Sequence, residues 1–227
     1  MGVALDLAPE QVTVAPGGRA VVGLRVRNTG EVVDQVDLTV LGDPAQWSVV
    51  EPVRVNLLPG QQVNVAVTLT PPRSWTVPAG DHHFAVRAAS REDPDNSVIE
   101  EGTVTVEAFR QLVAELVPAA PRVPRNGHHD LAVDNLGNTP VLLDLATTGS
   151  EGTLEFRWAR ARLLAGPGTA TLVHLRARPT TRFLRGPDRS LPFEVVVCDP
   201  DGTNPQTLAT AKGPFPGAGL LVGPDWR

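Results

Sequence analysis

The stretch Val26–Leu38 reads V-R-N-T-G-E-V-V-D-Q-V-D-L, and it returns as V-D-N-L-G-N-T-P-V-L-L-D-L at Val133–Leu145. In both copies a run that alternates apolar and polar residues ends at Asn-x-Gly, and an Asp-Leu pair follows at the same distance. Alternation with a period of two is the pattern of a strand with one buried face, and Asn and Gly favour turns because they tolerate positive φ. The stretch is therefore expected to form two strands joined by a turn, and its recurrence predicts a tandem duplication.

The same order of motifs recurs along the rest of the chain. Leu57–Gly60 corresponds to Leu163–Gly166, and Phe84 corresponds to Phe193, so the offset stays between 106 and 109 residues. Each half holds seven or eight short alternating runs, separated by Pro and Gly turns, which is typical of a β-sandwich. Pro9 is expected to break the first strand at a sheet edge. Trp47–Val50 and Thr153–Trp158 are expected to be equivalent short strands.

We therefore predict an all-β protein with two tandem immunoglobulin-like antiparallel β-sandwich domains. The first, acidic domain is assigned to residues 1–108, and the second, arginine-rich domain to residues 109–212. A Pro/Gly-rich C-terminal tail is assigned to residues 213–227. Because no flexible linker separates the last strand of the first domain from the strand expected at Phe109–Val117, the domains are expected to be rigidly joined.

Composition limits the class of protein further. The 227 residues suffice for two domains, and 41% of them are hydrophobic, as in ordinary globular proteins. Cys198 is the single cysteine, so no intrachain disulfide can form, which is compatible with a reducing compartment. No apolar run approaches the length of a membrane span, and the N-terminus does not resemble a signal peptide. A cytoplasmic location without membrane insertion is the expectation.

Charge is distributed unevenly between the halves. Residues 1–108 hold seven arginines against fourteen acidic residues, whereas residues 109–227 hold thirteen basic residues against eleven acidic ones. Eight arginines but one acidic residue, Asp188, fall within residues 157–189. These form the candidate interaction surface: Arg157, Arg160, Arg162, Arg176, Arg178, Arg182, Arg185 and Arg189.

Such a surface could bind an acidic protein surface, including the first domain of another copy of the chain. The competing interpretation is a face of arginines that only contact solvent. Nucleic acid is disfavoured as a partner, because the net charge is −5 and few aromatic residues are available to stack on bases.

The sequence offers no set of residues for catalysis, for a cofactor or for a metal ion. It contains no Gly-x-Ser-x-Gly motif, and Cys198 has no basic neighbour to lower its pKa. His82-His83 and His128-His129 are adjacent pairs, and adjacent residues on a strand point to opposite faces, so neither pair could hold one metal ion together. These histidines are expected to be solvated residues of loops. The protein is accordingly expected not to be an enzyme.

Several motifs resemble a known family. They are the Asn-x-Gly turn, the Leu-x-Pro-Gly turn before a Val-alternating strand, and the connection Arg178–Phe183 ahead of Leu191–Val195. They resemble the NEW3-type tandem immunoglobulin-like domains, which are common in actinobacteria and related in shape to PapD-like and major-sperm-protein sandwiches. The resemblance covers nearly the whole chain and implies an accessory or interaction role beside larger assemblies. The chain departs from immunoglobulin domains in lacking a cysteine pair and any tyrosine.

Two functional hypotheses follow. The first is a non-enzymatic protein–protein interaction or structural scaffold protein, which presents the edges and loops of two sandwiches to the partners of an assembly. The alternative is an accessory module that binds a carbohydrate or another small ligand on Trp47, Trp75 or Trp158. A hydrolase, a label that some relatives carry, is the least favoured, because no residues here support it.

Overall fold

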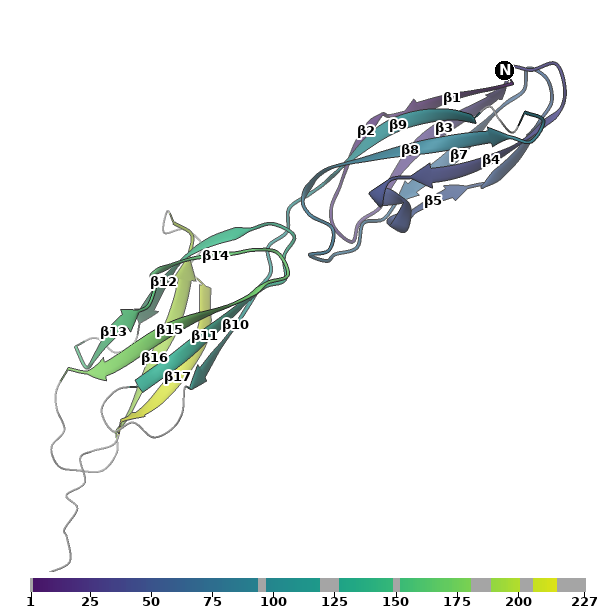
Figure 1. Ribbon diagram of the computed structural model, residues 1–227. Helices are drawn as coiled ribbons and strands as arrows, with labels where there is room; N and C mark the ends of the chain where they lie inside the picture. Colours follow the sequence, from purple (N-terminus) through teal and green to yellow (C-terminus); the bar gives the residue numbers. More distant parts are fainter. Residues whose placement is uncertain are drawn as a thin grey trace, which may run out of the picture. The chain divides into compact units, whose positions relative to one another are not determined.

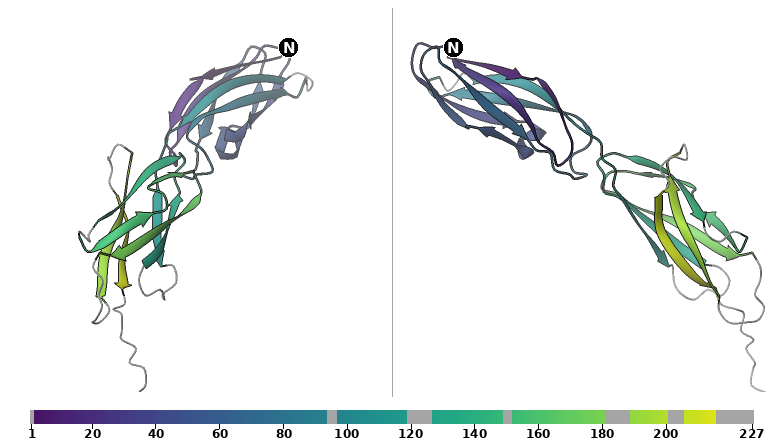
Figure 2. Two further views of the ribbon diagram at one scale, coloured as in Figure 1. Left: turned by 60° about the vertical axis from the view of Figure 1, so that its left-hand side comes forward. Right: turned by 180° about the vertical axis from the view of Figure 1, so that it is seen from behind.

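The computed structural model describes residues 2–93, 97–118, 127–148, 152–180, 189–200 and 206–215. The chain divides into two compact units, Met1–Phe109 (unit 1) and Arg110–Arg227 (unit 2). Each unit consists of two facing β-sheets, as the views in Figures 1 and 2 show. The predicted all-β sandwich class is confirmed.

The described residues of unit 1 form nine strands. They are β1 (Val3–Ala8), β2 (Gln11–Val14), β3 (Ala20–Asn28), β4 (Asp34–Leu41), β5 (Ser48–Glu51), β6 (Arg54–Leu57), β7 (Gln62–Leu69), β8 (Gly80–Ser90) and β9 (Ser97–Val106). One sheet has the order β1-β3-β7-β5, and the other has the order β2-β9-β8-β4-β6. As predicted, Pro9 interrupts the first strand, and β1 and β2 lie at the edges of different sheets. All pairings are antiparallel except that of β2 with β9.

Unit 2 repeats most of this order. Its described strands are β10 (Leu112–Pro118), β11 (Gly127–Asn135), β12 (Val141–Thr148), β13 (Leu154–Trp158), β14 (Arg162–Ala165), β15 (Ala170–Pro179), β16 (Arg189–Cys198) and β17 (Gln206–Phe215). Its sheets are β10-β11-β15-β13 and β14-β12-β16-β17. The first matches β1-β3-β7-β5 strand for strand, and the second places the edge strand β14 beside β12 as β6 lies beside β4.

Several boundaries differ from the prediction. The strand expected at Phe109–Val117 begins at Leu112, and Phe109 belongs to unit 1, where its ring lies 4.5 Å from the Arg73 guanidinium carbon. Residues 213–215, which were assigned to the tail, belong to β17, which runs to Phe215. Residues 216–227 lie outside the described residues.

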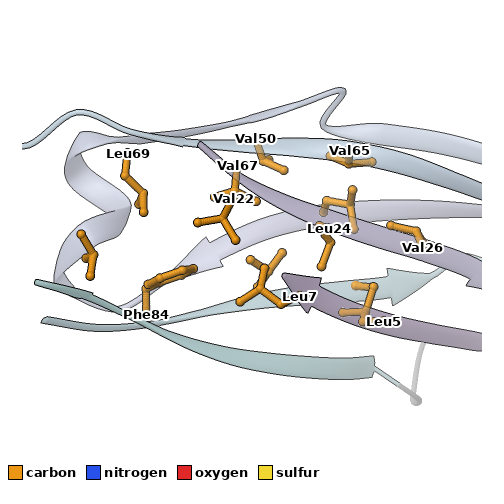
Figure 3. Packing of buried hydrophobic residues seen from close by; sticks show 14 of the residues in the cluster. Leu5, Leu7, Val22, Leu24, Val26, Val50, Val65, Val67, Leu69 and Phe84 are labelled. Atoms are coloured by element: carbon orange, nitrogen blue, oxygen red, sulfur yellow. The ribbon is translucent and has the colours of Figure 1, made fainter. Parts of the chain in front are cut away.

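The alternating apolar residues of the strands form one core in each unit. In unit 1 the side chains of both sheets meet in the space between them, as Figure 3 shows for Val22, Leu24, Val67 and Phe84. The equivalent core of unit 2 includes Phe193. In each strand, alternate side chains therefore point into the core and outward, and only the outward ones can reach a partner.

A buried asparagine fixes the turn of the duplicated stretch in both units. The Nδ2 of Asn28 donates to Val32 O (2.8 Å) and Leu57 O (3.0 Å), while its Oδ1 accepts from Gly30 N (2.8 Å). Asn135 makes the same three bonds, to Thr139 O (2.9 Å), Ala165 O (3.0 Å) and Gly137 N (2.9 Å). Both asparagines are fully buried. Each therefore connects the turn after its own strand to the end of the edge strand β6 or β14.

This network corrects the reason given above for the Asn-x-Gly motif. Gly30 and Gly137 are not among the glycines with positive φ, so left-handed backbone does not explain them. A Cβ on Gly30 would lie 3.2 Å from Asn28 Oδ1 and 3.4 Å from the backbone of Gly2. The glycine at this turn therefore gives the amide side chain room to approach the backbone.

The Trp47 region also differs from the prediction. Residues Asp43–Trp47 form a short 3-10 helix, η1, and the strand that follows, β5, begins at Ser48. Pro44 at the start of η1 favours the helix, because its fixed φ suits the first helical turn. Trp47 therefore ends a helix, whereas Trp158 ends the strand β13.

Candidate interaction surface

The predicted arginine-rich surface is divided between the two sheets of unit 2. Arg157 lies on β13, and Arg176 and Arg178 lie on β15 of the same sheet. Arg162 begins β14 in the other sheet, and Arg160 lies in the connection between β13 and β14. Arg189 begins β16, but its side chain is not described, and Arg182 and Arg185 fall outside the described residues.

Two of the described arginines have carboxylate partners within unit 2. The Nε and Nη2 atoms of Arg162 donate to the two carboxylate oxygens of Asp144, at 2.6 and 3.0 Å. Arg178 Nη2 donates to Glu155 Oε2 at 2.7 Å across β13 and β15. The hydrogen bond from Arg162 lowers the pKa of Asp144 from its ordinary value.

The pair Arg162–Asp144 has a counterpart in unit 1. Arg54 on β6 pairs with Asp37 on β4, and the hydrogen bond from Arg54 likewise lowers the pKa of Asp37. Because the same ion pair joins an edge strand to its neighbour in both units, we assign Arg162 a structural role within the sandwich.

Arg157, Arg176 and His128 form a row across three neighbouring strands. In the antiparallel register, Arg176 on β15 lies opposite Arg157 on β13 and opposite His128 on β11. All three side chains are exposed on the outward face of the sheet. Among the described residues none of the three has a hydrogen-bond or ion-pair partner. We call these three residues the basic row.

The basic row has neutral residues at the equivalent positions of unit 1. There, Thr68 on β7 lies opposite Val21 on β3 and opposite Val49 on β5. Both valines are about half exposed, at 49% and 51%. The two sheets therefore have equivalent strands, the same register and an outward face at this point. They differ in three side chains, which are positive or titratable in unit 2 and neutral in unit 1. We call Val21, Thr68 and Val49 the neutral row.

Carboxylates that contact other side chains lie on both sides of the basic row. Asp130 on β11 pairs with His174 on β15 two residues before Arg176, and Glu155 on β13 pairs with Arg178 two residues after it. Glu155 is thus already engaged with the Arg178 guanidinium, and Asp130 contacts the imidazole of His174. Among the described residues, neither carboxylate forms an ion pair with the basic row.

His128 was not included in the surface predicted from the sequence. The adjacent histidine pairs lie on strands, His82 and His83 on β8 and His128 and His129 on β11, so the expectation of loop histidines was wrong. The alternation of the strand could have placed His128 on the outward face. Its position beside Arg176 depends on register, which the sequence does not reveal.

The side chains of the adjacent residues His128 and His129 lie on opposite faces of the sheet, as the alternation of a strand predicts. His128 is exposed, whereas His129 is buried, with its ring 5.5 Å from that of Phe193 in an edge arrangement. Burial lowers the pKa of His129 from its ordinary value. No group of three His, Cys, Asp or Glu side chains suited to a metal ion occurs in the part of the chain that the structure describes.

The tryptophans occupy separate settings. Trp47 lines a hollow of about 280 Å³ in unit 1 with Asp43, Gln46 and His82, and its ring lies 6.1 Å from the His82 imidazole. Trp75 is 46% exposed, and Trp158 packs against the core of unit 2. Of the three candidates for a carbohydrate platform, Trp47 alone lines this hollow.

Cys198 is partly buried, and its Sγ lies 3.8 Å from Asp144 O. In the described part of the chain, no helix has the length and hydrophobicity to cross a membrane.

Comparison with known proteins yields structural likeness alone. No protein-family model and no curated protein match the chain. A protein of unknown function from Porphyromonas gingivalis W83 is 19% identical over 92% of this chain and 97% of that one, with a TM-score of 0.34. The YadV chaperone is 10% identical over 93% and 100% (TM-score 0.33), and the E. coli chaperone DraB is 13% identical over 92% and 97% (TM-score 0.34). Similarities this low carry no argument about function.

Proposed function

We propose that the protein is a non-enzymatic interaction protein, and that unit 2 binds an acidic protein partner through the basic row. The observation that carries the proposal is the contrast between His128–Arg176–Arg157 and the neutral row at the same place in unit 1. Like charges directly opposite each other on neighbouring strands destabilise a sheet. The row therefore costs folding energy that the neutral row does not.

A binding role explains that cost. Exposed guanidinium groups without carboxylate partners can form paired hydrogen bonds with a partner's carboxylates. Charges on an open sheet face also accelerate encounters with an oppositely charged protein and exclude basic ones. Arg160 is exposed in the connection that follows β13, three residues after Arg157, and adds positive charge to unit 2. The proposal includes a cytoplasmic location, with which the single cysteine is compatible, and a role within a larger assembly, as the resemblance to NEW3-type domains implies.

The test compares the partners of two variants in the native host. The binding variant carries Arg157→Gln and Arg176→Gln. The control carries Arg25→Gln and Arg27→Gln, which remove the same charge from the outward face of β3 in unit 1. Each chain is tagged, purified at two salt concentrations and examined by mass spectrometry.

We expect the wild type and the control to retain a common acidic partner, and the binding variant to lose it. Retention by the wild type should weaken at high salt, because salt screens exposed charges. A partner that the binding variant retains as well as the wild type does would show that the row is not its binding surface.

A further inference from the structure

The chemistry of the basic row points to a particular kind of anion. Two guanidinium groups and one imidazole rise from neighbouring strands at one register position. Side chains directly opposite each other on antiparallel strands have Cβ atoms about 5 Å apart. Arginine side chains are longer than that separation, so Arg157 and Arg176 can reach one oxyanion together, with His128 on the far side of Arg176.

A single carboxylate does not match this set of donors. It carries one negative charge, and one arginine fork satisfies both of its oxygens. A phosphoryl monoester carries a charge of about −1.5 to −2 at pH 7 and has three acceptor oxygens. It can accept paired hydrogen bonds from two guanidinium groups and still face an imidazole.

The surroundings of the row favour an external anion over an internal one. The carboxylate of Glu155 faces the same side of the sheet but already pairs with Arg178, and the carboxylate of Asp130 contacts the imidazole of His174. In unit 1, where the neutral row replaces the basic one, this arrangement of donors does not exist.

We infer that the basic row is a binding site for a phosphoryl monoester, the group that a phosphorylated side chain of a protein partner presents. The inference rests on the proposed function, because it names the group that the partner inserts between Arg157 and Arg176. Arg176 is central: it lies between the other two residues and donates to the same oxyanion as Arg157. His128 adds a further hydrogen-bond donor.

The test is an NMR titration of the full chain, which follows the arginine Nε–H signals and the His128 ring signals. The probes are O-phosphoserine, inorganic phosphate, acetate and a twelve-residue oligothymidylate, all at one ionic strength. The variants are Arg157→Gln and Arg176→Gln separately, and Arg25→Gln in unit 1 serves as the control. Thermal melting of each variant verifies that it remains folded.

We expect saturable shifts of Arg157, Arg176 and His128 with O-phosphoserine and with inorganic phosphate, but not with acetate. Each single arginine variant should weaken phosphoserine binding about tenfold or more, since a charge-assisted hydrogen bond is lost, and Arg25→Gln should leave it unchanged. Binding of inorganic phosphate but not O-phosphoserine would overturn the assignment to a side-chain monoester.

Two further outcomes would overturn the inference. Equal shifts with acetate would show that the row senses any anion. Binding of oligothymidylate without binding of O-phosphoserine would assign the site to a nucleic-acid backbone. In either case the partner experiment described above still decides whether the row binds a protein.

Discussion

Replacement of Asn28 by alanine should destabilise unit 1 more than a typical substitution does. The side chain is fully buried and makes three hydrogen bonds to backbone groups, of which the one to Leu57 O is itself buried. Alanine removes all three bonds and provides no replacement donor for Val32 O or Leu57 O. The change also disconnects the turn after β3 from the end of β6.

The magnitude follows from these bonds. A hydrogen bond contributes about 1 kcal/mol net, and a buried polar group left without a partner costs about 1–3 kcal/mol. We therefore expect Asn28→Ala to reduce the free energy of unfolding by about 3–5 kcal/mol. Small domains are stable by about 5–15 kcal/mol, so this is a large fraction of the total. Asn135→Ala should have a similar effect on unit 2.

Hydrogen exchange measured by mass spectrometry in increasing urea follows the two units separately within the full chain. Asn28→Ala should lower the urea midpoint of unit 1 peptides and leave those of unit 2 unchanged, and Asn135→Ala should do the reverse. Thr29→Ala is the control, because Thr29 is the exposed neighbour within the same turn. A loss below about 1 kcal/mol for Asn28→Ala, or one equal to that of Thr29→Ala, would refute the reasoning, because three lost hydrogen bonds of about 1 kcal/mol each predict a larger effect.

Three other changes test separate parts of the structure. Gly102→Ala should destabilise unit 1 by about 1–3 kcal/mol in urea unfolding, because a Cβ there would lie 2.7 Å from the Phe84 ring; an unchanged midpoint would contradict this packing. Unit 2 should lose stability as the pH falls below the ordinary histidine value of about 6.5, because the unfolded chain binds a proton that buried His129 resists. This loss should be smaller in His129→Leu, and an identical pH dependence would assign it to another group. The pKa of Asp144, measured by NMR titration, should lie below 3.8 and rise in Arg162→Gln. Any stability that this pair provides should disappear as the pH falls through the pKa of Asp144 in the folded state. A pKa unaffected by the substitution would show that the ion pair does not form in solution.

Local patterns were sufficient to predict the sandwich class and the outward or inward face of most residues. The alternation around Val26–Leu38 reports burial directly, since each strand buries every second side chain. The role of Asn28 could not be obtained in this way. Its buried acceptor, Leu57 O, lies 29 residues away, and nothing in the local turn shows that the two ends meet.

The candidate interaction surface, too, depends on contacts between residues that are distant in the sequence, which local patterns do not predict. Proximity along the sequence grouped Arg162 with Arg157, although the two lie in different sheets and Arg162 pairs with Asp144. Conversely, His128 lies 48 positions before Arg176 in the sequence but directly opposite it on the neighbouring strand. Which charges form one surface depends on strand register, which tertiary packing determines.

The most direct test of the proposed role exchanges the two rows between the units. One chain replaces the basic row by the residues of the neutral row, and a second chain carries both that replacement and the reverse exchange in unit 1. The first set of changes is His128→Val, Arg176→Thr and Arg157→Val, and the reverse set is Val21→His, Thr68→Arg and Val49→Arg. The measurement is recovery of the partner that binds the wild type. We predict that the first chain loses the partner and that the second regains part of the binding through unit 1; undiminished recovery by the first chain would contradict the assignment of the basic row as the binding surface.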